Sequence, residues 1–129
     1  MKKSNLIVVA AVGSAILLTG CLFPRYTTID ELWPTDDSRY AMTAEEASKL
    51  ARKLIADPPA GRSPNYPGDK QIAMSTTSIR LREHNRTGYV LVEVKEGRRV
   101  KMEFYVLTKA DGEKFAAAVW RLRKEYLEK

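Results

Sequence analysis

Apolar and polar side chains alternate along most of the stretch from Ile79 to Val106, and this alternation constrains the fold more than any other feature of the sequence. It occupies three runs, residues 79–82, 90–95 and 100–106. Successive side chains of a strand point to opposite faces of a sheet, so each run predicts a strand with one apolar face. Three such strands joined by short turns predict an antiparallel meander with one face in the core.

The apolar positions also predict how the strands pair, because core side chains must lie on the same face. Asn85-Arg86-Thr87-Gly88 supplies the even-numbered loop that the first hairpin needs, and this loop places Leu81 opposite Val92. Lys95-Glu96-Gly97 supplies an odd-numbered loop for the second hairpin and places Val92 opposite Val100. Gly97 is expected to take the left-handed conformation of a bulged turn.

A helix is predicted to begin at Thr43. Thr43 and Glu46 have the spacing of a capping box, in which each side chain bonds a backbone amide at the helix start. The apolar residues that follow share one helical face: Ala47, Leu50, Ala51, Leu54 and Ile55. Asp57-Pro58-Pro59 ends this helix, and residues 58–69, which hold four of the chain's six prolines, are predicted to form a loop.

A second helix is predicted from residues 108–111 almost to the last residue. Its apolar stripe consists of Phe115, Ala118, Val119, Leu122 and Tyr126, and is widened by Ala116, Trp120 and Leu127. The resulting arc is roughly 200° wide, about twice that of an ordinary surface helix. One edge of the arc should cover the sheet, and the other should meet the first helix, the N-terminal segment or a partner. Packing inside the domain is the favoured interpretation.

The order helix, meander, helix predicts a single α+β domain over residues 43–129, with both helices on the apolar face of a three- to four-stranded antiparallel sheet. Ile72 and Met74 have the opposite parity to Ile79 and Leu81. This change predicts a bulge or a turn within residues 75–78 and leaves room for a fourth short strand before it.

The N-terminal residues have the pattern of a targeting signal. Lys2-Lys3 precedes an uncharged run, Leu6 to Leu18, whose helical length of roughly 20 Å falls short of the ~30 Å hydrocarbon core of a bilayer. The run ends in Leu18-Thr19-Gly20-Cys21, which resembles the lipobox of bacterial lipoprotein signal peptides. The resemblance implies cleavage between Gly20 and Cys21, a diacylglycerol thioether on the Cys21 sulfur and an N-acyl lipid on its new amino group. A retained transmembrane anchor is the alternative.

Residues 1–20 are therefore predicted to be a signal peptide, and residues 21–42 a lipidated tether. The resemblance implies a protein held to a membrane by its lipid. Leu22, and not the aspartate that often signals inner-membrane retention in this class, follows the cysteine. The resemblance thus favours the outer membrane of a two-membrane bacterium.

The predicted tether lacks sustained periodicity, but it is too apolar for a pure spacer. Its large side chains include Trp33 and Tyr40. The spacing of Thr28 and Glu31 allows one capped helical turn. We expect the Trp33 end to pack on the domain, and a partner-binding motif is the alternative.

Groups suited to catalysis or metal binding are scarce. The sequence has one cysteine and one histidine, which excludes an intramolecular disulfide, a cysteine-clustered zinc or iron–sulfur site and a multi-histidine metal centre. The histidine, His84, falls beside a polar turn, and the acidic pairs at 36–37 and 45–46 lie on the tether and at a helix start. We expect no catalytic residues, no metal and no cofactor other than the covalent lipid on Cys21.

Basic side chains collect on the outer face of the predicted sheet: Arg80, Arg82, Lys95, Arg99 and Lys101. Such a face could bind anionic lipid, lipopolysaccharide or an acidic wall polymer, whereas nucleic acid is not a ligand expected for an exported protein. Glu93, predicted to lie opposite Arg99, and Glu103 lie among these bases. A solvated face of cross-strand ion pairs is therefore the favoured interpretation.

The sequence leads to two functional hypotheses. The first is a non-enzymatic, membrane-anchored lipoprotein that presents a protein-interaction module in the bacterial envelope, with Trp33, Tyr40 and Trp120 as candidate anchors for a partner. The second is a binder of anionic lipid or wall polymer through the five basic residues of the sheet. Ionic strength separates them, because salt weakens polyanion capture far more than an interface built on aromatic side chains.

Overall fold

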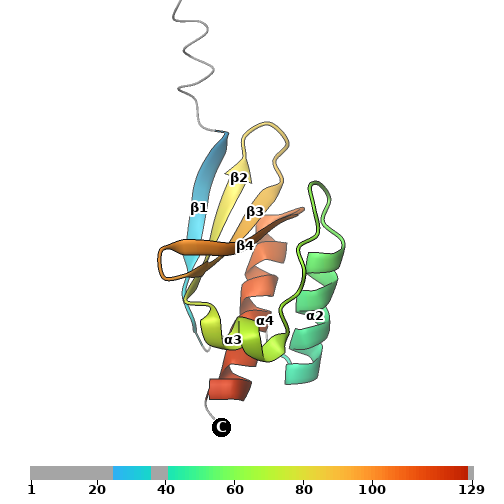
Figure 1. Cartoon of the computed structure of the whole chain (residues 1–129). Coiled ribbons are helices and arrows are strands. Elements are labelled where there is room, and N and C mark those ends of the chain that lie inside the picture. Colours follow the sequence, from blue (N-terminus) through green and yellow to red (C-terminus); the bar gives the residue numbers. More distant parts are fainter. Residues whose placement is uncertain (1–24, 36–40, 128–129) are drawn as a thin grey trace, which may run out of the picture.

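The computed structural model describes residues 25–35 and 41–127, which form a four-stranded antiparallel sheet and three helices. In chain order the elements are β1 (Tyr26–Leu32), α2 (Ala44–Ala56), α3 (Asp69–Ser75), β2 (Ser78–His84), β3 (Val90–Glu96), β4 (Arg99–Val106) and α4 (Lys109–Leu127), shown in Figure 1. The strands lie in the order β1-β2-β3-β4, so each strand pairs with its neighbour in sequence. The predicted α+β class with an antiparallel meander is confirmed.

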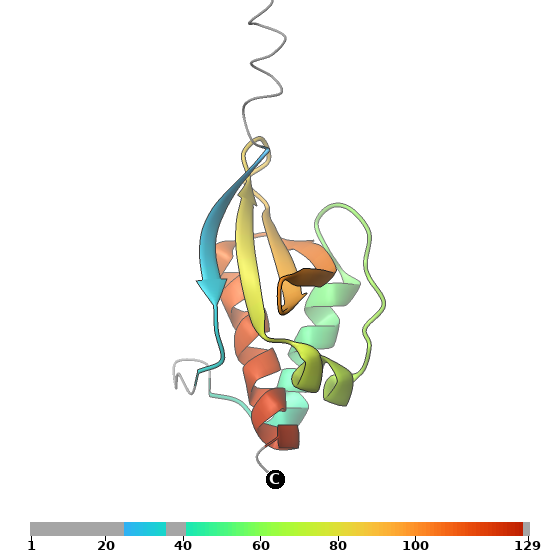
Figure 2. The same ribbon diagram turned by 60° about the vertical axis from the view of Figure 1, so that its left-hand side comes forward.

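The helices cover one face of the sheet, which we call the inner face. In both ribbon views α4 lies behind the sheet with α2 beside it, and α3 closes the lower end (Figures 1 and 2). The core between them is built from the predicted apolar positions of strands and helices: Ala47, Ala51, Ile55, Ile79, Leu81, Val90, Val92, Val94, Phe104, Val106, Phe115, Ala118, Val119 and Leu122. Helix and sheet approach closely at Gly112, where an added Cβ would lie 2.8 Å from a methyl group of Leu81.

The periodic signals predicted both long helices correctly. Thr43 Oγ1 accepts a hydrogen bond from the Glu46 amide, and Glu46 Oε1 accepts one from the Thr43 amide, which completes the capping box. Helix α2 ends at Ala56, with Asp57 as its C-cap. The wide apolar arc of α4 is buried inside the domain as far as Leu122, because α4 packs against α2 and α3 as well as the sheet, whereas Tyr126 and Leu127 at its end are exposed.

The first hairpin has the predicted register, whereas the second is displaced. Leu81 lies opposite Val92 as predicted. Val92, however, lies opposite Phe104 and not Val100. The turn has two residues, Gly97-Arg98, with Gly97 at φ +65°. A bulge between Val94 and Lys95 adds one residue, and this keeps the apolar side chains of β3 and β4 on the same face of the sheet. Alternation fixes which face a side chain occupies, but it does not distinguish registers that differ by an even number of residues.

The largest difference from the sequence prediction is strand β1, which lies inside the predicted tether. Residues 26–32 pair with β2, from Tyr26 opposite His84 to Leu32 opposite Ile79. Residues 28–31 are therefore part of a strand and do not form the helical turn that their spacing allowed. Ile29 and Leu32 pack against the core. A bulge between Thr28 and Asp30 interrupts the strand, and this extra residue hides the period of two that would have revealed it.

Residues 69–75 form helix α3 and not the fourth strand that Ile72 and Met74 suggested. Ile72 and Ala73 are buried, and Met74 is exposed. The helix ends at Thr76, whose amide donates to the Ile72 carbonyl, and β2 begins two residues later. The predicted interruption within residues 75–78 is thus a helix end, and a helix of seven residues, about two turns, is too short to show a period in the sequence.

Candidate functional site

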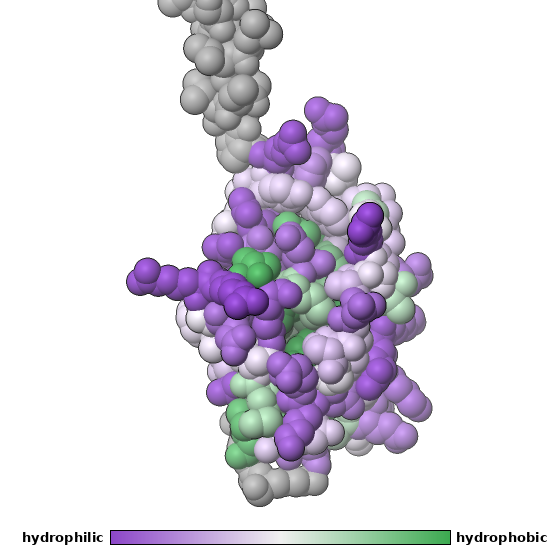
Figure 3. Space-filling model, in the orientation of Figure 1, coloured by the Kyte–Doolittle hydropathy of each residue, from purple (hydrophilic) through white to green (hydrophobic). Residues whose placement is uncertain are grey.

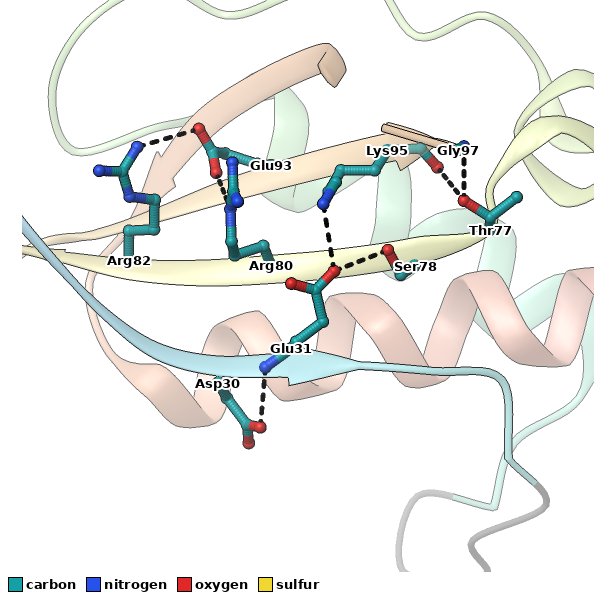
Figure 4. Close-up of polar contacts among 9 residues, drawn as sticks. All are labelled: Asp30, Glu31, Thr77, Ser78, Arg80, Arg82, Glu93, Lys95 and Gly97. Atoms are coloured by element: carbon teal, nitrogen blue, oxygen red, sulfur yellow. Dashed lines mark hydrogen bonds and ion pairs between the residues drawn. The ribbon is translucent and has the colours of Figure 1, made fainter. Parts of the chain in front are cut away.

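The outer face of the sheet, opposite the helices, carries most of the side chains that the sequence singled out. This face is turned toward the viewer in Figure 3, where hydrophilic side chains cover much of it and hydrophobic patches lie among them. Its centre is Glu93 on β3, which is only 5% exposed. Arg80 Nε donates to Glu93 Oε1 at 2.6 Å, and Arg82 Nη1 lies 3.5 Å from Glu93 Oε2 (Figure 4). One buried carboxylate therefore compensates two of the five predicted basic residues.

A second carboxylate neutralises Lys95, and it comes from β1. Glu31 Oε2 accepts from Lys95 Nζ at 3.4 Å and from Ser78 Oγ at 2.8 Å (Figure 4). The sequence prediction missed Glu31 because it left β1 out of the sheet. Glu31 is far in sequence from Lys95, and it reaches this face because β1 pairs with β2, which places Glu31 opposite Arg80.

The remaining two predicted bases lie on β4. Arg99 is exposed beside the Gly97-Arg98 turn, and it pairs in register with Glu96 and not with Glu93. Lys101 is partly buried, and this burial lowers the pKa of its ammonium group while nearby Glu96 acts in the opposite direction. Three of the five predicted bases, Arg80, Arg82 and Lys95, are thus ion-paired inside the domain, in line with the favoured interpretation for these residues.

Glu93→Gln should lower the free energy of unfolding by about 1–3 kcal/mol, because it removes the charge to which two partly buried guanidinium groups bond. Glu103→Gln is the matched control, since Glu103 lies directly opposite Glu93 but is exposed. The control should change stability by less than about 0.5 kcal/mol in urea unfolding. Equal effects of the two variants would contradict the assignment of Glu93 as the centre of this face.

An aromatic cluster lies on the same face, where β1 begins and β2 ends. The hydroxyl groups of Tyr26 and Tyr105 are hydrogen-bonded to each other although they come from the two edge strands. The His84 ring contacts both tyrosine rings edge-on, and the Arg82 guanidinium lies 5.0 Å from the centre of the Tyr26 ring. Position 61, in the loop after α2, lies against the Tyr105 ring.

His84 has a structural explanation in this cluster. Its Nδ1 accepts hydrogen bonds from the backbone amides of Arg86 and Thr87, at 3.3 and 3.2 Å, and so it caps the turn between β2 and β3. Its ring is held between two tyrosines. These contacts account for His84 as a residue that positions the turn and the two tyrosine rings.

Burial, together with the hydrogen bond between its hydroxyl and that of Tyr26, raises the pKa of Tyr105 from its ordinary value of 10.0 to about 12. The folded state therefore holds this proton more tightly than the unfolded state. Its contribution to stability should be intact below pH 10 and should be lost as the pH rises toward 12. Tyrosinate absorbance should show delayed ionisation, and Tyr105→Phe should remove the part of it that Tyr105 contributes while leaving the part that Tyr66 contributes. A titration unchanged by this substitution would contradict the partly buried hydrogen-bonded pair.

A second polar cluster fixes the start of α3 to α2. Asp69 Oδ1 accepts from Ser48 Oγ at 2.9 Å and from Tyr66 Oη at 2.6 Å. Arg52 lies over the Tyr66 ring and 3.6 Å from Asp69. Burial and the bond to Asp69 raise the pKa of Tyr66. Because each group is bonded within the domain, this cluster explains how α3 is positioned rather than suggesting a reaction.

The three predicted aromatic anchors have different surroundings. The chain that leads to Trp33 packs on the domain through Leu32, as expected, but the Trp33 side chain itself is 62% exposed just beyond β1. Trp120, which was predicted to be a candidate surface anchor, is 7% exposed and belongs to the hydrophobic core, so that prediction is wrong. Because Trp120 lies on the widened edge of the α4 arc, its sequence position allowed either packing inside the domain or exposure to a partner. The structure packs it inside the domain. Tyr40 lies outside the described residues, as do Gly20 and Cys21.

Large exposed apolar side chains gather at the end of the domain where α4 terminates. Four of the five such side chains among the described residues belong to three segments: Trp33 after β1, Met74 in α3, and Tyr126 and Leu127 at the end of α4. The fifth, Leu107, lies between β4 and the start of α4. These three segments all lie at the lower end of the domain in both ribbon views (Figures 1 and 2). We call this surface the C-terminal pole.

Residues 25–35 and 41–127 contain neither a group of metal ligands nor a helix that could span a membrane. Within these ranges, no three His, Cys, Asp or Glu side chains are grouped so that they could hold a metal ion. No helix in the same part of the chain has both the length and the apolar character needed to cross a bilayer.

Comparison with known proteins adds no assignment. Neither a family model, nor a curated protein, nor a solved structure matches the chain.

Proposed function

We propose that this protein is a non-enzymatic bacterial lipoprotein, anchored by lipid on Cys21 and displaying its α+β domain as a protein-interaction module in the envelope. The observation that carries the proposal is Leu18-Thr19-Gly20-Cys21, placed directly behind a short uncharged run that follows two lysines. The cysteine of this motif is also the sole cysteine of the chain. Leu22 after it favours the outer membrane of a two-membrane bacterium.

The C-terminal pole supports the interaction role. Trp33 is the largest exposed apolar side chain there, and tryptophan is among the residues most enriched at the energetic centres of protein interfaces. Exposed aromatic and aliphatic side chains grouped at one end of a small domain are typical of a surface that a partner covers.

The alternative role, capture of a polyanion by the outer sheet face, gains little support. Arg80, Arg82 and Lys95 are already paired with carboxylates inside the domain. A phosphate or uronate ligand would have to compete with Glu93 and Glu31 for the same guanidinium and ammonium groups. We therefore favour a protein partner.

Photo-crosslinking in native membranes tests the interaction role. A photoreactive residue at position 33 should trap one defined neighbour, whereas the same residue at exposed position 103 on the outer sheet face should not. Met74→Ala, made in the chain that carries the probe at position 33, should reduce capture about tenfold or more if the C-terminal pole is the contact surface. Equal capture from positions 33 and 103, or capture at 33 that Met74→Ala leaves unchanged, would contradict the proposal.

Trp33→Ala in the otherwise unmodified chain provides a further prediction. Because Trp33 is largely exposed, this substitution should change the free energy of unfolding by less than about 0.5 kcal/mol. It should nevertheless remove co-purification of the trapped neighbour. Loss of folding in this variant would show that Trp33 has a structural role instead.

A further inference from the structure

The start of β1 and the turn between β2 and β3 are fixed together at one end of the domain. The Asn85 amide donates to the Arg25 carbonyl at 2.8 Å, and Thr27 Oγ1 bonds Asn85 Oδ1 at 2.8 Å. Both segments lie at the upper end of the domain in Figures 1 and 2, away from the C-terminal pole. We call the surface formed by Arg25 and residues 85–88 the N-terminal pole.

The chain that links this pole to the proposed lipid is short. Arg25 is four residues after Cys21, and four fully extended residues span at most about 14 Å. Helix α4 alone, with 19 residues, is about 28 Å long. If Cys21 carries the lipid, as proposed above, the link is too short for the domain to turn over and bring its C-terminal pole to the same membrane. The N-terminal pole must then be the part of the domain nearest the lipid headgroups.

The charge of the N-terminal pole suits an anionic surface. Arg25 and Arg86 are both exposed there. Glu83, one residue before His84, is the exposed acidic residue closest in sequence to this turn. The pole therefore presents two guanidinium groups against one carboxylate, and guanidinium binds phosphate oxygens with charge-assisted hydrogen bonds.

We propose that the N-terminal pole is a membrane-docking surface, on which Arg25 and Arg86 bind the phosphate groups of anionic lipids in the bilayer that holds the Cys21 lipid. This inference rests on the proposed lipidation. In the docked state the N-terminal pole contacts the membrane. The C-terminal pole, with Trp33, then points away from the membrane. The short link brings the two arginines to the headgroups, and their charge then fixes the orientation.

The orientation can be measured on the lipidated protein, because the lipid occupies its sole native thiol. Thr87→Cys places a fluorophore at the N-terminal pole, and Gln71→Cys places it on an exposed position of α3. Each labelled protein is reconstituted into phosphatidylcholine vesicles, with or without phosphatidylglycerol, that contain a headgroup-linked nitroxide quencher. We expect strong quenching at position 87 and little at position 71 when phosphatidylglycerol is present.

Charge variants test the role of the arginines. Arg25→Gln and Arg86→Gln should each lower the ratio of docked to undocked domain about fivefold in the anionic vesicles. Arg98→Gln, an identical change in the exposed turn between β3 and β4, should leave the ratio unchanged. High salt should lower the ratio of docked to undocked domain in the unsubstituted protein as well, because salt screens the attraction between the arginines and the phosphates.

The outcomes separate this inference from the proposed function. Mass spectrometry and vesicle co-sedimentation first establish whether the chain carries lipid; a chain without lipid overturns the lipoprotein proposal and, with it, the docking surface. If the lipidated protein shows equal quenching at positions 71 and 87, or if Arg98→Gln acts like Arg25→Gln, the docking surface is wrong while the lipoprotein proposal stands.

Discussion

Cys21→Ser should abolish incorporation of fatty acid into the protein and should leave residues 1–20 attached. The proposed lipid is joined through the cysteine sulfur, and a serine hydroxyl is a much weaker nucleophile than a thiol. Acyl chains contribute about 0.8 kcal/mol per buried CH₂, so the lipid accounts for nearly all of the membrane affinity that the proposal assigns to the mature protein. The measurement is metabolic labelling with a radioactive fatty acid, followed by the size of the labelled band.

Leu22→Ala is the matched control for this experiment, because it changes the adjacent residue and keeps the thiol. It should retain the label and the shorter chain. Label that persists in Cys21→Ser would contradict lipidation at this position. A retained transmembrane anchor predicts no label in either variant and no change in chain length.

Removing β1 should produce the largest loss of stability. A chain that begins at Arg25 retains the whole described domain, whereas a chain that begins at Met42 lacks β1. The shorter chain loses the backbone pairing with β2, the packing of Ile29 and Leu32, and the carboxylate of Glu31 beside Lys95. We expect its free energy of unfolding to be lower by roughly 3–5 kcal/mol, measured by urea denaturation.

The same comparison tests the boundary of the domain. If residues 25–41 were only a tether, the two chains would unfold at the same urea concentration. If β1 belongs to the domain, the chain from Arg25 should match the mature protein in stability and the chain from Met42 should not. Glu31→Gln in the longer chain provides a smaller intermediate change, because it removes only the partner of Lys95 and alters the bond to Ser78.

The parts of the fold that the sequence predicted are those with a sustained period. Strands β2, β3 and β4 and helices α2 and α4 each carry a regular apolar pattern, and the first hairpin register followed from it. The second register could not be predicted, since the alternation of Val90–Val94 with Val100–Val106 permits several even-numbered displacements. Strand β1 was missed because of its bulge, and α3 because it is too short to repeat a pattern.

The residues that meet on each candidate surface are brought together by pairing between distant strands. The spacing of apolar residues along one sequence does not show which distant strands pair. Three of the five basic residues, Arg80, Arg82 and Lys95, form ion pairs of the kind expected from the sequence. Glu31 became visible as the partner of Lys95 only when β1 joined the sheet. Trp33 and Trp120 were both candidate anchors in the sequence, but Trp120 is buried in the core on α4, whereas Trp33 is exposed beyond the end of β1. The position of Arg25 beside Asn85 likewise depends on β1.

Intact-mass analysis of the protein extracted from its native membrane tests the central claim most directly. Lipidation predicts a chain that starts at Cys21, with a mass above that of residues 21–129 by one diacylglycerol group or by that group and one further acyl chain. A chain that still contains residues 1–20, or that has an unmodified thiol at position 21, would contradict the account.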